Sequence, residues 1–358
     1  MQSSKFNFAG FLIVSFSLSI EAHAEVTVYG VVDVGIEALS NAPVAGTKRG
    51  GTLIREQSAN AQLSRIGFKG SETIDPCLKA IFKLDAAFFP DTGSLSPNGK
   101  LFHGSSYVGL SGCQGELTLG RHISLLYEEA YYFDPLSIFA YSLPSMDVTG
   151  FGGRADNSIK YRRSLGSWTL TGFYSTGYSG AYEETAGSPR IAREMSMSIN
   201  YDDRFLAGGI AIDHLNGTTP DTKNQITDRI FLAGSLTFEK DKIFAGYQHY
   251  HQTALNAIPV ATYDLIWAGA QHAWSAQLNS AVGVFHQKYS TGQGSATLAA
   301  AYLDYFLSKR TDVYMNVGYM KNSGSLNLGV DGQPGIIGPG TLPGQAQAGL
   351  AIGVRHTF

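Results

Sequence analysis

One pattern recurs along almost the whole chain: short segments in which apolar and polar side chains alternate, separated by turns. The segment 193–201 shows it most clearly, because methionine, isoleucine and tyrosine alternate there with glutamate, serine and asparagine. A period of two is that of a β-strand with one apolar and one polar face. The sequence therefore predicts an all-β protein.

The alternation predicts about sixteen strands, an even number that suits a closed antiparallel sheet. The first and last strands both alternate, so they can pair with each other and leave no open edge. The predicted strands cover residues 25–39, 61–70, 78–88, 102–112, 116–121, 156–163, 168–178, 193–201, 205–214, 227–238, 242–251, 262–272, 275–286, 296–307, 311–320 and 345–358.

The links between the predicted strands alternate in length. Short links at 239–241, 272–274 and 308–310 contrast with long links rich in Gly, Pro and Asn at 216–226 and 322–344. Short turns at one end and long loops at the other are typical of a closed transmembrane β-barrel, whereas a soluble β-sandwich has no reason to sort its loops. A barrel of this size would leave an aqueous channel lined by the polar faces of the strands.

The composition agrees with a membrane barrel. Only 15% of the residues are charged, against about 25% in typical soluble domains, while 44% are hydrophobic. Beyond the N-terminal residues, no apolar stretch is long enough for a transmembrane helix. Such a chain is expected to place apolar side chains in lipid through alternation along its strands. The formal net charge of −3 gives no basic footprint for nucleic acid.

Residues 1–24 have the features of a secretory signal peptide. Lys5 precedes an uncharged run over 6–20, and Ala22-His23-Ala24 supplies the small residues of a cleavage point. The apolar run is too short for a membrane anchor. We expect cleavage after Ala24, which leaves residues 25–358 as a single barrel domain.

Export would place the two cysteines, Cys77 and Cys113, in an oxidising compartment. Each lies beside a predicted tight turn on the same rim of the barrel, so a disulfide between them is one interpretation. The other is that they are two unrelated small apolar residues, because spacing alone does not prove connectivity.

Residues 122–153 interrupt the strand pattern. A loop this long is uncommon in a compact domain unless it is functional, and Pro135 and Pro144 disfavour a long helix or strand within it. We interpret it as a plug segment folded into the lumen, where acidic and aromatic groups suit a narrow, wet passage. Its acidic residues are Glu128, Glu129, Asp134 and Asp147, and its aromatic residues include Tyr127, Tyr131, Tyr132, Phe133, Phe139 and Tyr141.

Seven sequence blocks carry a family resemblance through their order and spacing. They are VTVYGVVDVGIE (Val26–Glu37), SRIGFKGSE (Ser64–Glu72), LKAIFKLD (Leu78–Asp85), YVGLSG (Tyr107–Gly112), GELTLGR (Gly115–Arg121), RADNSIKY (Arg154–Tyr161) and VRHTF (Val354–Phe358). With them the chain closely resembles the general porins of Gram-negative outer membranes, above all those of Neisseria- and Burkholderia-like bacteria. The turn Thr73–Cys77 departs from the pattern, because relatives tend to have a glycine-rich turn there.

The resemblance implies a homotrimer of sixteen-stranded barrels in which the third external loop narrows the lumen. That role would fall to residues 122–153, with acidic residues of the loop facing a basic cluster on the opposite wall. The matching positions are Glu128, Asp134 and Asp147 on the loop, and Arg65, Lys69, Lys83 and Arg121 on the wall. The terminal Phe358 matches the family's signal for outer-membrane assembly.

Two further basic residues, Lys160 and Arg162, lie on the polar face of the predicted strand 156–163. They are candidates for the same basic side of the constriction. Opposed charges would create a transverse field, which low-dielectric walls focus. The alternative is ordinary solvation of the lumen wall, where any inward residue can be charged.

Other chemistries find little support in the sequence. His249 and His251 share one face of a strand, but no carboxylate or cysteine cluster joins them, so we expect no metal site and no cofactor. No nucleophile motif indicates a barrel protease or lipase, so we expect no enzyme.

Together these features predict an outer-membrane porin for passive diffusion of small hydrophilic solutes and ions. Its expected surroundings are outer-membrane lipid, lipopolysaccharide and the assembly machinery. The alternatives are a porin of the same fold that prefers one solute class, such as organic acids, and a non-conducting adhesin barrel. The nearly balanced charge leaves anion or cation selectivity open.

Overall fold

The computed structural model describes residues 24–95, 99–138, 140–147, 150–178, 184, 186–253, 261–290, 292–332, 334 and 338–358. The predicted signal peptide, except for Ala24, lies outside these residues, and so does Phe139 of the predicted plug segment.

The described chain contains two helices and eighteen strands. The helices are α1 (Leu125–Phe133) and α2 (Leu143–Asp147). The strands are β1 (Ala24–Pro43), β2 (Gly50–Ser58), β3 (Arg65–Asp75), β4 (Leu78–Phe89), β5 (Ser94–Leu95), β6 (Ser105–Gly112), β7 (Gly115–Ile123), β8 (Arg154–Leu165), β9 (Trp168–Ser175), β10 (Glu194–Asp202), β11 (Leu206–Asn216), β12 (Ile226–Phe238), β13 (Asp241–Gln252), β14 (Ala261–Ala273), β15 (Leu278–Tyr289), β16 (Ser295–Phe306), β17 (Thr311–Asn322) and β18 (Ala346–Thr357).

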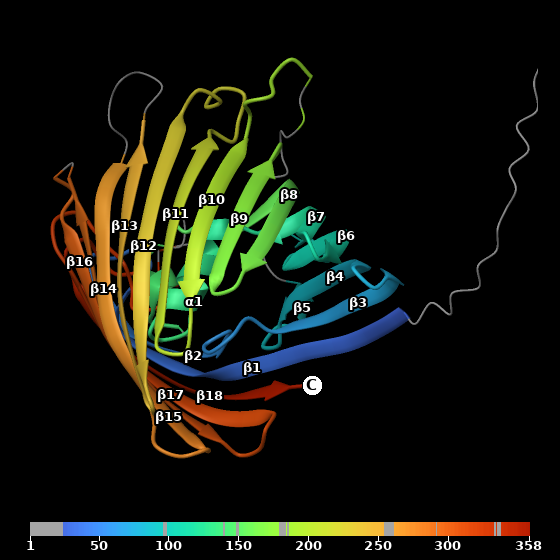
Figure 1. Ribbon diagram of the computed structural model, residues 1–358. Coiled ribbons are helices and arrows are strands. Elements are labelled where there is room, and N and C mark those ends of the chain that lie inside the picture. Colours follow the sequence, from blue (N-terminus) through green and yellow to red (C-terminus); the bar gives the residue numbers. More distant parts are fainter. Residues whose placement is uncertain are drawn as a thin grey trace, which may run out of the picture.

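The strands form a closed antiparallel barrel (Figure 1). The ends of the sheet meet where β1 pairs with β18, from Val31 opposite Thr357 to Leu39 opposite Gly349. β2 and β3 follow each other along the same edge of β1 and count as one barrel strand. The two-residue β5 pairs only with the end of β4. Sixteen barrel strands remain, and the predicted all-β closed barrel is confirmed.

The prediction of one strand over 61–70 is wrong, because the second barrel strand consists of two segments, β2 and β3, with a break between them. Residues 59–64 separate β2 from β3, and Ala59 there has a φ of 66°. The buried carboxylate of Asp33 in β1 accepts hydrogen bonds from the backbone N–H groups of Ala61 at 2.8 Å and Gln62 at 2.6 Å. The N–H groups of Ala61 and Gln62 have no partner in the neighbouring strands that the structure describes at this break, and the Asp33 carboxylate accepts their hydrogen bonds instead.

The alternation sorts side chains between the two faces of the wall as predicted. On β1, Ile36 is 63% exposed on the outer face, whereas Asp33 and Glu37 are fully buried on the inner face. Apolar side chains on the outer face of a membrane barrel contact lipid, so their exposure in the isolated chain is expected.

The plug segment folds inside the barrel, where α1 lies within the ring of strands in Figure 1. Helix α1 contacts β10 to β13, and α2 contacts β15. Pro135 lies just beyond α1, and Pro144 lies in the first turn of α2, where the missing N–H has no helical partner to lose. The two ends of the segment meet where the Ser124 N–H donates to the Gly153 carbonyl at 2.9 Å.

A second long loop, between β17 and β18, also packs inward. Leu328 and Val330 of this loop are buried in the same apolar cluster as Tyr141 of the plug segment. Asp331 Oδ2 accepts a hydrogen bond from Arg55 of β2 at 2.7 Å, and Arg55 also pairs with Glu37 of β1. In the part of the chain covered by the structure, no helix is long and apolar enough to cross a membrane.

Candidate functional site

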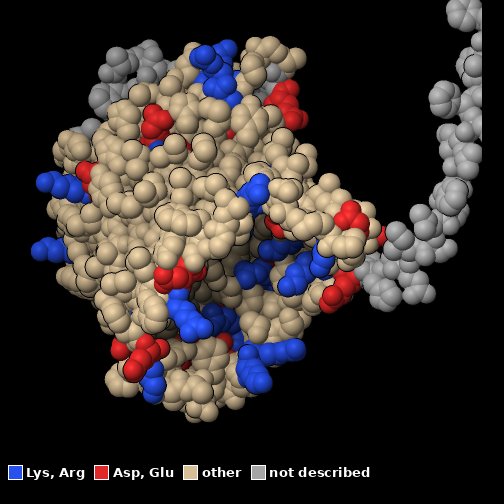
Figure 2. Space-filling view, viewed as in Figure 1, with Lys and Arg blue, Asp and Glu red and all other residues tan. Residues whose placement is uncertain are grey.

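A cavity of about 580 Å³ lies in the lumen between α1 and the opposite wall. β3, β4, β8, β9 and β10 contribute side chains to its lining. The space-filling view shows a hollow with lysine and arginine side chains gathered around it (Figure 2). The cavity is therefore the part of the lumen that the plug segment narrows on one side and basic side chains border on the other.

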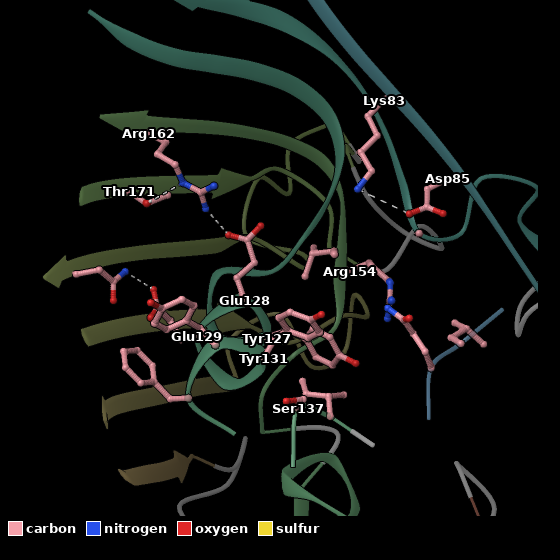
Figure 3. Close-up of a pocket in the computed structure, with 18 of the residues that line it drawn as sticks. Lys83, Asp85, Tyr127, Glu128, Glu129, Tyr131, Ser137, Arg154, Arg162 and Thr171 are labelled. Carbon is pink, nitrogen blue, oxygen red and sulfur yellow. Dashed lines mark hydrogen bonds and ion pairs between the residues drawn. The ribbon is translucent and has the colours of Figure 1, made fainter. Parts of the chain in front are cut away.

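Helix α1 has an apolar face toward the wall and a polar aromatic face toward the cavity. Leu126, Ala130 and Phe133 are buried against the barrel. Tyr127 and Tyr131, one helical turn apart, line the cavity and lie beside each other in the close-up (Figure 3). The amphipathic sequence of α1 thus fixes which of its residues reach the lumen.

The wall also holds the C-terminal end of α1. Trp267 Nε1 donates a hydrogen bond to the Phe133 carbonyl at 3.1 Å, and Gln271 Nε2 donates to the Pro135 carbonyl at 2.8 Å. The last carbonyls of a helix have no partner within the helix, so Trp267 of β14 satisfies one of them, and Gln271 of the same strand holds the residue just beyond the helix. The helix is anchored through its backbone as well as its apolar side chains.

Glu128 is the acidic residue of α1 that faces cations across the lumen. Its Oε1 accepts a hydrogen bond from Lys160 Nζ, and its Oε2 accepts one from Arg162 Nη2, both at 2.6 Å. Both cations belong to β8 and are among the predicted basic residues, and Figure 3 shows the contact with Arg162. Arg162 lines the cavity, whereas Lys160 is buried beside it.

The predicted basic residues Arg65 and Lys83 also line the cavity and share one carboxylate. Arg65 Nε lies 4.0 Å from Asp85 Oδ2, and Lys83 Nζ lies 3.8 Å from the same oxygen. Lys69 is the cross-strand neighbour of Lys83, and its Nζ lies 5.5 Å from the centre of the Tyr29 ring. Two lumen cations therefore share one carboxylate, with a third cation beside them.

The predicted basic residue Arg121 does not line the cavity. It forms an ion pair with Asp156, which also pairs with Lys100. His103 lies close to this group, and Arg121 Nε donates to its backbone carbonyl at 3.0 Å. Burial, followed by the charges of Arg154, Arg121 and Lys100, lowers the pKa of His103 to about 4. Burial is the main cause of this lowered pKa, and the three nearby cations act in the same direction.

The other three acidic residues predicted for the constriction are buried and hold the plug segment together. Asp134 accepts hydrogen bonds from the backbone N–H groups of Leu136, Ile138 and Leu143 at 3.0–3.3 Å. Asp147 binds the wall residues Tyr263 and Gln248, and Glu129 accepts a hydrogen bond from Asn200 Nδ2 at 2.7 Å. The expectation that Asp134 and Asp147 face the basic wall is therefore corrected, whereas Glu129, predicted only for the constriction, does belong to the cavity lining.

Burial changes the acidity of Asp134 and Glu129. Desolvation raises the pKa of Asp134 to about 6, although its hydrogen bonds lower it. Desolvation also raises the pKa of Glu129, with the hydrogen bond from Asn200 acting in the opposite direction. A carboxylate with three backbone donors is a structural group, and sequence reasoning could not separate it from a lumen-facing one.

Two arginines that face the interior were missing from the sequence-based set. Arg154 begins β8 and lines the cavity, with its guanidinium carbon 5.3 Å from the centre of the Tyr127 ring. Arg229 of β12 is buried and pairs with Asp213 at 2.5 Å and with Glu194 at 3.4 Å. A register shift in the pairing of β7 with β8 separates Arg154 from the alternating face that carries Lys160 and Arg162, so the period of two did not point to Arg154. Arg229 lies at an inward position of β12, where the period of two was a usable signal.

Cys77 and Cys113 form a disulfide with a Cα–Cα distance of 5.4 Å. They join the turn between β3 and β4 to the turn between β6 and β7, where the Cys113 N–H also donates to the Cys77 carbonyl at 3.1 Å. The unusual turn before Cys77 contains a register shift between Thr73 and Asp75. Asp75 Oδ1 accepts a hydrogen bond from the Cys77 N–H at 2.7 Å.

The C-terminal residue and the paired histidines lie away from the cavity lining. Phe358 exchanges backbone hydrogen bonds with Gly30 at 3.0 and 3.1 Å, and its role in assembly stays a prediction. His249 is hydrogen-bonded to Asp264, and His251 to Thr262. Within the described ranges, no group of three or more His, Cys, Asp or Glu side chains is placed to hold a metal ion.

Comparison with known proteins gives relatives that match almost end to end. Outer membrane porin protein 32 of Delftia acidovorans is 26% identical over 97% of this chain and 97% of its own length. An outer membrane porin protein of Bordetella pertussis is 23% identical over 98% of both chains.

A solved structure, the anion-selective porin from Comamonas acidovorans, is similar in fold. It has a TM-score of 0.82 and 22% identity, and the match covers 94% of this chain and 100% of that one.

The family model described as Gram-negative porin matches residues 9–325. This match and the full-length relatives place the barrel in the outer membrane as a channel. The chain belongs to the Gram-negative porin family.

Proposed function

We propose that this porin admits small hydrophilic solutes by passive diffusion and favours anions over cations. The observation that carries the proposal is the clustering of lysine and arginine side chains along the wall of the narrowed lumen, where the lining holds four basic and four acidic residues. Arg65, Lys83, Arg154 and Arg162 line the cavity. Asp85 lies near two of these cations, and Glu128 is held between Lys160 and Arg162.

The other two acidic residues of the lining, Glu129 and Asp202, are each held by a hydrogen bond from a neighbouring side chain. Glu129 is buried and hydrogen-bonded to Asn200. Asp202 lies at the end of β10 and accepts a hydrogen bond from Tyr132 at 2.6 Å. A positive potential between low-dielectric walls concentrates anions and excludes cations. The fold neighbour from Comamonas acidovorans is itself named an anion-selective porin, which supports the same preference here.

The test is the zero-current potential of purified protein in a planar bilayer under a KCl gradient. The expected potential has the sign given by chloride crossing faster than potassium. A potential of the opposite sign would overturn the anion preference. Absence of conductance from correctly folded protein would overturn the channel.

We also propose that three copies assemble into a trimer. One of the fold neighbours, OmpT of Vibrio cholerae, was solved in a trimer form. Its TM-score is 0.67 with 16% identity, and the match covers 94% of this chain and 99% of that one. Molar mass from light scattering in detergent tests the assembly: three chain masses support the trimer, and one or two chain masses reject it.

We also propose that outer-membrane lipid, lipopolysaccharide and the assembly machinery are partners of this porin.

We further propose that residues 1–24 are removed as a signal peptide, and N-terminal sequencing of the mature protein tests this cleavage. A mature chain that begins at Glu25 supports cleavage after Ala24.

A further inference from the structure

Among the cations that line the cavity, Arg154 differs in its partners. Arg65 and Lys83 lie near Asp85, and Arg162 is bonded to Glu128. Within the described chain, Arg154 makes no ion pair with a carboxylate, and its buried Nε has no hydrogen-bond partner. A buried donor of this kind favours a ligand that brings an acceptor, most of all an anionic one.

The groups next to Arg154 are aromatic. Its guanidinium lies over the Tyr127 ring, and Tyr131 follows one turn later on the same face of α1. Tyr131 is 55% exposed, so much of its ring is open to the lumen. In Figure 3 the two tyrosines and Arg154 face one space, with Ser137 at its edge. Exposed aromatic faces attract other aromatic rings in stacked or edge-to-face geometries.

Two further cations border the same cavity. Lys83 and Arg65 border it, with Asp85 between them. The volume of about 580 Å³ falls within the range of about 300–1,000 Å³ that is usual for sites that bind small organic molecules. A ligand with one planar ring and one carboxylate would meet both kinds of group at once.

We propose that Arg154, Tyr127 and Tyr131 form a binding site for aromatic carboxylates inside the lumen. The guanidinium of Arg154 binds the carboxylate, and the ring of the solute packs against the tyrosines of α1. The site rests on the proposed anion-favouring channel and adds a solute class that the channel retains during passage. A solute held there occupies the narrowed lumen and lowers the current carried by chloride.

The test compares benzoate with cyclohexanecarboxylate as blockers of single-channel KCl current. Both carry one carboxylate on a six-membered ring, and only benzoate is aromatic. Benzoate is expected to reach half-block at about fivefold lower concentration, which corresponds to ~1 kcal/mol for one aromatic contact. Equal half-blocking concentrations, or no block by either compound, in channels that conduct and favour chloride would overturn the site and leave the proposed function intact.

Variants assign the effect to the named residues. Arg154→Gln is expected to weaken benzoate block about tenfold by removing a charge-assisted bond, and Tyr131→Leu is expected to abolish the preference for benzoate over cyclohexanecarboxylate. Arg163→Gln is the matched control, because Arg163 lies near the other end of the same strand and is not among the residues that line the cavity. If Arg154→Gln does not fold, the Tyr131→Leu variant still tests the site, because the Tyr131 side chain is exposed. A preference that survives Tyr131→Leu rejects the aromatic contact.

Discussion

At the scale of single residues, Glu128 determines how much positive charge the lumen presents. It is the predicted acidic residue that contacts two wall cations, Lys160 and Arg162. Lys160 is only 6% exposed, so its charge is held by this contact and by its hydrogen bond to the Ile123 carbonyl at 3.1 Å. A buried ion pair is sensitive to loss of one partner, because the other charge remains buried.

Glu128→Gln is expected to increase anion preference. Glutamine keeps one oxygen acceptor, for either Lys160 or Arg162, and removes the negative charge, so the positive potential at the cavity rises. The permeability ratio of chloride to potassium, taken from zero-current potentials, should increase about twofold. Glu56→Gln is the control, because Glu56 is exposed on the opposite face of β2 from Arg55. An unchanged ratio for Glu128→Gln would contradict the role given to this carboxylate.

Asp331 connects the inward loop between β17 and β18 to Arg55, and its protonation should affect stability. Burial, followed by the charge of Glu37, raises its pKa from the ordinary value of 3.8 to about 7. The folded state therefore binds a proton at pH values where the unfolded state does not. This group alone makes the fold more stable as the pH falls from about 7 to about 4, and that stability is lost as the pH rises through 7.

Asp331→Asn is therefore expected to flatten the pH dependence of the thermal unfolding midpoint between about pH 5 and pH 8. The same midpoint series for Asp221→Asn, an exposed loop aspartate, should keep the wild-type shape. If the Asp331→Asn curve runs parallel to that of wild type across this range, Asp331 does not titrate as its surroundings indicate.

At the scale of elements, alternation predicted strands even where the inward face carries apolar residues, such as Phe231 and Ala233 of β12. β10 and β12 follow the expected pattern, and their boundaries lie within a residue or two of the predicted ones. The pattern missed β2, because its sequence GGTLIREQS is nine residues long and starts with two glycines, which leaves few alternating positions. The break at 59–64 could not be predicted either, since it depends on acceptors from Asp33 in another strand.

The disulfide is the covalent link between two neighbouring hairpins. It closes a loop of 36 residues, and in the chain-entropy model such a loop is worth about 3–4 kcal/mol. The double variant Cys77→Ser/Cys113→Ser is expected to unfold at lower urea concentration, with unchanged conductance, because the cysteines do not line the cavity. Wild-type protein under reducing conditions should match the variant. A urea midpoint equal to that of oxidised wild type would mean that the link contributes little.

At the scale of the whole molecule, the plug segment makes the two halves of the lumen different. α1 packs its apolar face on β10 to β13, while Arg65, Lys83 and Arg162 project from β3, β4 and β8. These cations are up to 97 positions apart in the sequence, which is the interval from 65 to 162. Alternation showed which of them point inward, but only barrel register and plug position decide which share the narrowed section. For that reason the sequence could predict a basic wall, but it could not show that Arg154 lines the cavity and Arg121 does not.

If anion preference arises from the summed field of these cations, it should weaken with salt. The Debye length falls from about 10 Å at 0.1 M to about 3 Å at 1 M, so charges across an open lumen are screened at high salt. The chloride-to-potassium permeability ratio from zero-current potentials should therefore be larger with KCl solutions near 0.1 M than near 1 M, at the same concentration ratio. Glu128→Gln should show the steeper decline, because it adds charge to the same wet section. A ratio that does not change with salt would show that selectivity comes from direct contact with desolvated ions at single side chains, and would move the explanation from the whole lumen back to individual residues such as Arg154.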